Sequence, residues 1–538
     1  LLADKGVLEN AIVVVLSDHG EALGHDSDSM LRKTGSSREV WDSLWGHGTS
    51  VMSPHQYSVL LAMRAYGRAA LPGPPGAHDW PVSLEDVRPT LEEFATGQAP
   101  QGVDGISLWL VLLAAGLFFL AIVAVAVRTP DRPRAFLGLL LLAECGLLGL
   151  FAAGDLILFY VFWEAMLVPF ALLMWMWGSG ERGRATMTFV IYTMIGSLLM
   201  LIAILSTAFI AQGPGEALTF NIRELTGQAW STDQSTWLFI GFALAFLIKL
   251  PLWPFHGWMP GAYATAPLVV TGLLSAVMSK AGVYGLMRIG VPMFPEGADR
   301  MAVAISVLAV IGIIYGSLVA WRAKTMRMLV AYSSLAHLGF IVLGIMAFDL
   351  TAGQGAVLQM VNHGIVTAAA FAIVGIVARA KRGDEELDQI AGLANGAPWL
   401  AGVFLIVTMA ALAIPGSNAF VGEFFILTGV FAERPLLAVL ACFGVVYSAV
   451  YMLRLYQGAM NGPKRGLSSR AELGWRDALY LSPLVVAMLL IALWPAAIVG
   501  STEKSVTRVV AAALECPPGQ VEVSGNVAEP NAPTRVCQ

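Results

Sequence analysis

Hydrophobic residues divide the chain into two parts. Up to about residue 104, short apolar runs alternate with polar stretches, whereas after Ile106 one long apolar run follows another. A helix needs about 20 residues to cross the roughly 30 Å hydrocarbon core of a bilayer. Twelve runs reach that length, approximately 107–128, 134–154, 155–178, 184–212, 236–256, 266–289, 301–321, 327–348, 355–379, 398–432 (interrupted), 435–457 and 478–499.

Positive charges in the loops fall into two sets that alternate along the chain. The larger set is Arg128, Arg132, Arg134, Arg182, Arg184, Arg322, Lys324, Arg327, Arg379, Lys381, Arg382, Arg454, Lys464, Arg465, Arg470 and Arg476. The smaller set is Arg223, Arg288, Arg300 and Arg434. The positive-inside rule places the larger set in the cytoplasm and the C-terminus outside. A wrong number of spans would have mixed the two sets.

The N-terminal part has the pattern of a soluble domain. The run AIVVVLS leads into the polar sequence DHGE, as buried strands do at the carboxyl edge of an α/β sheet. We therefore expect a small α/β fragment over 1–104, a membrane domain over 105–500 and a polar tail over 501–538. The first residues, LLADKGVLEN, lack a Met and the pattern of a signal peptide, so we expect the chain to be truncated there.

Composition supports the membrane interpretation and excludes other classes. The 538 residues are 57% hydrophobic and 13% charged, and the mean hydropathy is +0.71. A net charge of −5 without a dense basic cluster argues against a nucleic-acid partner. The four cysteines show no CxxC spacing that would suggest zinc or iron–sulfur binding. We expect lipid and other membrane subunits as partners.

Ionisable residues inside the expected spans are the strongest sign of function. Each costs about 2.5–3.5 kcal/mol at the bilayer centre on insertion scales. Burial and neighbouring charges change the proton affinity of Lys and Glu, and His exchanges protons near neutral pH, so such a set can relay protons. Glu–Lys pairs that only stabilise helix packing are the alternative. The seven residues are Glu144, Glu164, Lys249, Lys280, His337, His363 and Glu423.

Two spans are interrupted by proline. Lys249 is followed by Pro251 and Pro254, and Glu423 follows the break AIPGSNAFVGEF. Carbonyls freed by proline survive at membrane depth only beside a cavity or a polar group. The breaks fall in the fourth member of two consecutive five-helix units, 134–289 and 301–457. Five is odd, so the units are expected to be inverted repeats, as in transporters. The alternative, that proline kinks only shape the bundle, would explain one break but not the matching position of both.

Several segments resemble one known family. GVDGISLWLVLL, GDLILFYVFWEAMLVPF, FLIKLPLWPFHGWMP, SKAGVYGLMRI, MLVAYSSLAHLGFI, LQMVNHG and AIPGSNAFVGEF are similar to motifs of the antiporter-like membrane subunits of proton-pumping NADH:quinone oxidoreductase (complex I), chain M in particular. The resemblance covers about 102–500. It implies an all-α polytopic protein in the bacterial inner membrane, next to other antiporter-like subunits. NADH, FMN, iron–sulfur clusters and quinone would then be bound by partner subunits and no cofactor by this chain.

The resemblance also implies roles for the ionisable residues. Glu164 corresponds to the acid that pairs with the lysine of the broken helix, Lys249, and Lys280 to the central lysine. His337 and His363 correspond to relay histidines, Glu423 to the terminal group and Glu144 to an accessory acid. Quinone reduction elsewhere would shift the Glu164/Lys249 pairing and drive a proton through Lys280 and His363 to Glu423. This proton-translocating subunit is the function we expect.

Other functions share part of this pattern. A subunit of a cation/proton antiporter or of a membrane hydrogenase would use the same helices and charges. A structural scaffold would need none of the charges. The loop WMPGAYATAP also departs from the family pattern, because Gly261, Tyr263 and Thr265 stand where relatives commonly have Asp, His and an acid.

Residues 1–104 resemble the C-terminal part of sulfatases and related alkaline-phosphatase-type hydrolases. Asp18 and His19 in SDHGE and His47 in GHGT match that family's metal ligands, and such a donor set suits a divalent cation. A solvated polar loop is the alternative. The part that supplies the nucleophile is missing, so we expect an inactive fragment, not a membrane-tethered hydrolase. GVDGISL fits both families, which suggests an artificial join there.

Overall fold

The computed structural model describes residues 104–215, 217–381, 383–463 and 472–514, together with two strands near the N-terminus. The chain forms two compact units, Leu1–Gln101 and Gly102–Gln538. In the first, β1 (Ile12–Leu16) pairs antiparallel with β2 (Leu61–Ala65). The strand predicted from AIVVVLS is confirmed. The remainder of the predicted α/β fragment, including Asp18, His19 and His47, lies outside the described residues.

The described part of the second unit consists of helices. They are α3 (Gly105–Val127), α4 (Pro133–Ala152), α5 (Leu156–Ala165), α6 (Leu167–Trp177), α7 (Arg182–Ala211), α8 (Ile222–Thr226), α9 (Thr232–Lys249), η3 (Phe255–Trp258), α10 (Met259–Thr265), α11 (Leu268–Leu273), η4 (Leu274–Met278), α12 (Ser279–Gly285), η5 (Leu286–Gly290), α13 (Val291–Met293), α14 (Pro295–Arg322), α15 (Met326–Ile345), α16 (Leu350–Ala380), η6 (Leu387–Gln389), η7 (Leu393–Asn395), α17 (Pro398–Ala411), α18 (Asn418–Glu433), α19 (Pro435–Met460), α20 (Trp475–Leu493) and α21 (Ala496–Ala513).

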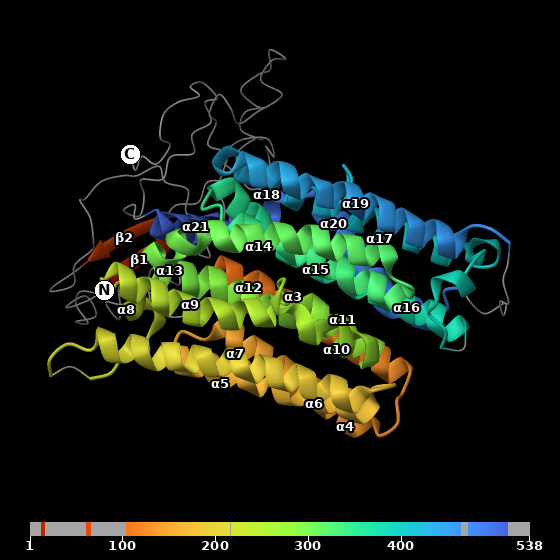
Figure 1. The fold of residues 1–538 in the computed structure, drawn as a ribbon, viewed down its shortest axis with the longest axis horizontal. Helices are drawn as coiled ribbons and strands as arrows, with labels where there is room; N and C mark the ends of the chain where they lie inside the picture. The colour runs from red at the N-terminus through yellow and green to blue at the C-terminus, as the bar shows by residue number, and fades with distance from the viewer. Residues whose placement is uncertain are drawn as a thin grey trace, which may run out of the picture. The chain divides into compact units, whose positions relative to one another are not determined.

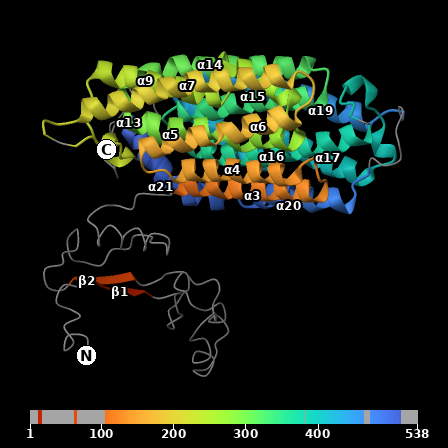
Figure 2. The ribbon, with the colours of Figure 1, turned by 90° about the horizontal axis from the view of Figure 1, so that it is seen from below.

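The long helices run side by side, as the two views in Figures 1 and 2 show. Among the described residues, ten helical segments are long and apolar enough to cross a membrane, or up to eleven if a bent pair is counted as one span. This confirms a polytopic α-helical membrane protein. Two of the twelve predicted spans, 236–256 and 398–432, are not among the ten. The structure ends α9 at Lys249 and divides the second span into α17 and α18, each shorter than a bilayer is thick.

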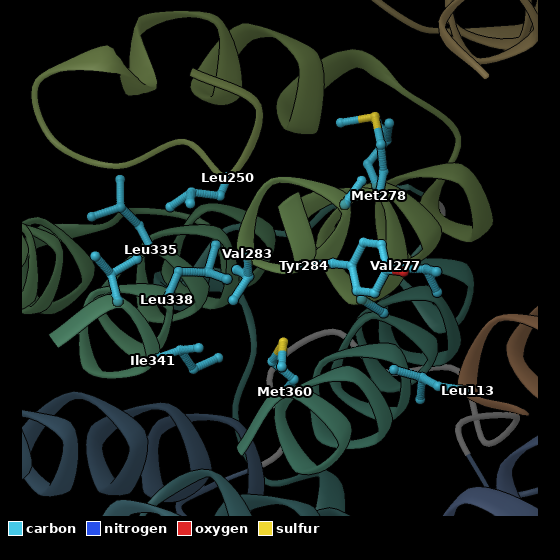
Figure 3. Packing of buried hydrophobic residues seen from close by; sticks show 14 of the residues in the cluster. Leu113, Leu250, Val277, Met278, Val283, Tyr284, Leu335, Leu338, Ile341 and Met360 are labelled. Carbon is cyan, nitrogen blue, oxygen red and sulfur yellow. The ribbon is translucent and has the colours of Figure 1, made fainter. Parts of the chain in front are cut away.

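Three segments form the centre of this unit. The spans Leu268–Met293, Met326–Ile345 and Leu350–Ala380 are each 89% buried, whereas the other seven candidate spans are 33–50% buried. Figure 3 shows Val283, Leu335, Leu338 and Met360 from these segments close together in the core. The helices that carry Lys280, His337 and His363 are therefore shielded from lipid by the rest of the bundle.

Both predicted helix breaks are present, and each has a local cause. After Lys249, Pro251 has no N–H to continue the helix, and the indole Nε1 of Trp258 donates to the carbonyl of Ile248 over 2.8 Å. The carbonyl of Leu247, to which Pro251 cannot donate, accepts instead from the N–H of Leu252 over 3.0 Å. Both carbonyls thus find donors inside the protein, as backbone at membrane depth requires. Between α17 and α18 the chain turns through Gly416, whose φ of 91° favours glycine.

The C-terminal boundary differs from the prediction. Residues 501–513, placed in the polar tail, belong to α21. Thr502, Val506 and Val510 are buried on one face of this helix, and Ser505 Oγ accepts a hydrogen bond from the backbone N–H of Gly105 over 3.2 Å. This amphipathic helix packs against α3 and α16. The polar residues on its other face led to its assignment to the polar tail.

Candidate functional site

Lys280 lies at the centre of the bundle and is completely buried. It is held on α12, between two π-helical segments, η4 and η5. Its Nζ donates to the carbonyl of Ser275 over 3.0 Å and lies 2.5 Å from Nδ1 of His363. An ammonium group carries three donors and no acceptor, so a protonated Lys280 can hand a proton directly to this imidazole.

A second pair continues from His363 toward α18. The rings of His363 and His337 lie 5.9 Å apart between centroids. Nδ1 of His337 lies 2.7 Å from Oε1 of Glu423. All three side chains are buried. The structure therefore brings four of the predicted residues, including Lys280, into one buried polar track across α12, α16, α15 and α18.

A small cavity adjoins the two histidines. Its volume is about 20 Å³, and its lining includes Ser333, Ser334, His337, Gln359 and His363. A cavity needs roughly 10–15 Å³ of such volume, and several polar partners, to hold one water. Within the described residues Nε2 of His363 is buried without a hydrogen-bond partner. One water in this cavity would give that nitrogen a partner beside His337.

Three neutral residues of the site were missed by the sequence analysis. Gln359 donates from Nε2 to Oε1 of Glu423 over 2.9 Å. Asn362 Nδ2 donates to the carbonyl of Asn418 over 2.7 Å, and Asn418 Nδ2 donates to Asn362 Oδ1 over 3.0 Å. The Asn362–Asn418 pair joins the first turn of α18 to α16 and so fixes the position of Glu423. The search for charged groups alone passed over these residues.

Lys249 contacts the aromatic residue that precedes Glu164 in the chain. Lys249 is 1% exposed, and its Nζ lies 5.0 Å from the ring centroid of Trp163, which precedes Glu164 on α5. In the described part of the chain, neither Nζ of Lys249 nor Oε1 of Glu164 has a hydrogen-bond partner. Glu164 and Lys249, which were predicted to pair, are therefore neighbours in this structure but form no direct ion pair. The cation–π contact takes its place.

The two lysine helices meet at a glycine. A Cβ at Gly282, two residues after Lys280, would lie 2.4 Å from the carbonyl oxygen of Phe246 on α9. Only glycine permits this approach, which sets the separation of α9 and α12. Phe246 and Leu250, which lie against Gly282, belong to the buried hydrophobic core.

The remaining predicted residues lie apart from the track. Glu144 is half-buried on α4, next to the exposed Cys145. Tyr263, in the loop that departs from the family pattern, is fully buried, and Thr265 Oγ1 donates to the carbonyl of Gly261 over 3.0 Å. The loop residues that differ from the family pattern therefore complete the helical turn of α10 with neutral groups.

A bundle of membrane-spanning length with a buried polar track defines a polytopic α-helical membrane protein. The family model described as "NADH:quinone oxidoreductase/Mrp antiporter, TM" matches residues 153–448. The chain is 36% identical over 419 residues to "NADH-quinone oxidoreductase subunit M" of Rhodobacter capsulatus, covering 76% of this chain and 81% of that protein. It belongs to this family.

Solved structures agree with this assignment. Respiratory complex I from Thermus thermophilus with bound NADH contains a chain that is 33% identical, with a TM-score of 0.71, covering 76% of this chain and 85% of that one. A chain of the Mrp complex from Dietzia is 22% identical with a TM-score of 0.67, covering 76% and 83%. At that identity the second match shows a common fold.

Proposed function

We propose that the chain is a proton-translocating membrane subunit of an NADH:quinone oxidoreductase, and that quinone reduction elsewhere in the complex drives it. The observation that carries this proposal is the buried track from Lys280 through His363 and His337 to Glu423. Ionisable groups at membrane depth are costly in themselves, so a buried set of them marks a functional site such as a proton relay. Here four of them lie in line on the three most buried spans and α18.

The proposed cycle starts at Lys249. A change in the pairing of Glu164 with Lys249 alters the proton affinity of the lysine, because a nearby carboxylate stabilises its charged form. A proton then passes by way of Lys280 and His363 to His337 and leaves from Glu423. Nζ of Lys249 has no hydrogen-bond partner among the described residues, so this first transfer is the step that needs a rearrangement or transient water.

The fold supports a finer architecture for this function. We infer that α9 with η3 and α10, and α17 with α18, cross the membrane as broken spans, which restores the predicted twelve. They then take the fourth position in two inverted five-helix units, 134–289 and 301–457. Broken helices beside midplane charges are typical of transporters. Neighbouring membrane subunits of the oxidoreductase are the expected partners, in a bacterial inner membrane.

The test uses Lys249→Ala and Glu164→Gln in the assembled oxidoreductase, reconstituted into vesicles. We expect both variants to lose most proton pumping, measured as quinone-dependent acidification of the vesicle interior. Glu144→Gln, which alters an acid outside the track, should have a smaller effect. Pumping that continues unchanged in Lys249→Ala would refute the proposal and favour a structural scaffold.

The same measurement separates the antiporter alternative. A chain that exchanges cations for protons would show transport driven by an imposed sodium gradient in the absence of NADH and quinone. Proton movement that requires quinone reduction and ignores sodium supports the proposed function.

A further inference from the structure

A second and larger cavity lies between helices of the bundle. Its volume is about 730 Å³, and apolar side chains of α3, α4, α11, α16 and α20 line it, Leu117, Val125, Leu273, Phe371 and Leu484 among them. It lies within the described part of the second unit. None of the ionisable track residues contributes to its lining.

The cavity has the depth of one lipid leaflet. On α3 its lining runs from Leu117 to Arg128, and on α16 from Ala368 to Arg379. Eleven residues at 1.5 Å per residue give a depth of about 16 Å on each helix, roughly half of the hydrocarbon core. Both stretches end in arginine, so the apolar part and the charged part of the cavity are stacked along the membrane normal.

Positive charge is in excess at the arginine end. Arg128 and Arg379 share one oxygen, Oδ1 of Asp477, at 2.5 and 2.6 Å, and Arg327 pairs with Glu385. Three guanidinium groups against two carboxylates leave one positive charge. Both Arg128 and Arg379 are about one-third exposed.

Donors remain available at this end. The hydrogen bonds of Arg128 and Arg379 within the described residues run through Nη2. A guanidinium group has five N–H donors in a planar fork that matches phosphate oxygens. Asp477 holds the guanidinium groups of Arg128 and Arg379 side by side. Trp177 also lines the cavity, and aromatic residues are typical of the headgroup level of a membrane.

We propose that this cavity binds one anionic phospholipid, with an acyl chain along α3 and α16 and the phosphate on Arg128 and Arg379. Depth, apolar walls and the single excess charge each match a phosphodiester lipid with one negative charge. Basic pockets between membrane helices recognise such headgroups. The bound lipid would tie α3 and α20 to α16.

The experiment uses the full chain in phosphatidylcholine vesicles with a trace of phosphatidylglycerol that carries a photoreactive group in its acyl chain. Mass spectrometry of the digested protein locates the adducts. We expect adducts on the stretches 117–128 and 368–379, removed by excess unlabelled phosphatidylglycerol and retained in excess phosphatidylcholine. Competition by inorganic phosphate alone should be weak, since the acyl chain provides much of the binding.

Two variants test the two halves of the site. Arg128→Gln should lower the adduct yield about tenfold, the effect of losing a charge-assisted hydrogen bond, while Arg379 still pairs with Asp477. Ala372→Phe, which fills the cavity from α16, should abolish the adduct. The matched control is Arg322→Gln at the end of α14, outside the cavity, with unchanged yield. Equal competition by phosphatidylcholine, an unchanged yield in Arg128→Gln, or no adduct on these stretches would overturn the proposal.

Discussion

The contact between α9 and α12 is open to a direct test with Gly282→Ala. The added Cβ would lie 2.4 Å from the Phe246 carbonyl oxygen and 3.0 Å from Leu250, whereas ordinary contact begins at 3.4 Å. The two helices would therefore separate by about 1 Å, because backbone atoms in a closely packed interior cannot move aside locally. Overpacking of this kind costs about 1–3 kcal/mol.

The same displacement acts on proton transfer between the two lysine helices. A misplacement of about 1 Å can slow a chemical step by about a hundredfold. We expect Gly282→Ala to reduce quinone-driven pumping in vesicles by one to two orders of magnitude and to lower the denaturation midpoint in detergent. Gly116→Ala on α3, where a Cβ meets nothing within 4 Å, is the control. If the two variants behave alike in both assays, the glycine contact does not set the helix separation.

Two further substitutions test other contacts. Asn418→Ala removes the donor to Asn362 Oδ1, and a buried acceptor without a partner costs about 1–3 kcal/mol. We expect reduced pumping with normal quinone reduction. Asn418→Asp should pump less than Asn418→Gln, because an ionised aspartate cannot donate a hydrogen bond; equal pumping by these two variants would contradict the role given to the Asn362–Asn418 pair. Arg327→Ala leaves Glu385, whose side chain is only 14% exposed, without its partner and should destabilise the protein by about 1–3 kcal/mol, measured by denaturant titration. A loss below about 1 kcal/mol, the value of an exposed pair, would show that the pair is solvated.

Hydrophobic run length was sufficient to find the membrane helices, because a span must be continuous and apolar. It was insufficient where helices deviate from regular geometry. The run 155–178 is divided near Met166, and the π-helical segments beside Lys280 have no compositional mark. The tail helix α21 was missed because its apolar face is narrow and its other face is charged.

The candidate site was predictable as far as its charges. A charged side chain in an apolar run stands out, and Lys280, His337, His363 and Glu423 do lie together. Their order in space, and the lack of a direct ion pair between Lys249 and Glu164, depend on packing between helices that no local pattern records. Gln359, Asn362 and His363 share one face of α16 at helical spacing. That spacing was a signal that an analysis of neutral polar residues would have found.

The small cavity beside His337 and His363 has a consequence for what the protein excludes. A space that admits a single water cannot accommodate a metal ion together with the oxygen atoms that must replace its hydration shell. A proton needs no such shell, because it travels as a rearrangement of bonds. Selectivity against sodium would then follow from the tightness of the core at this point.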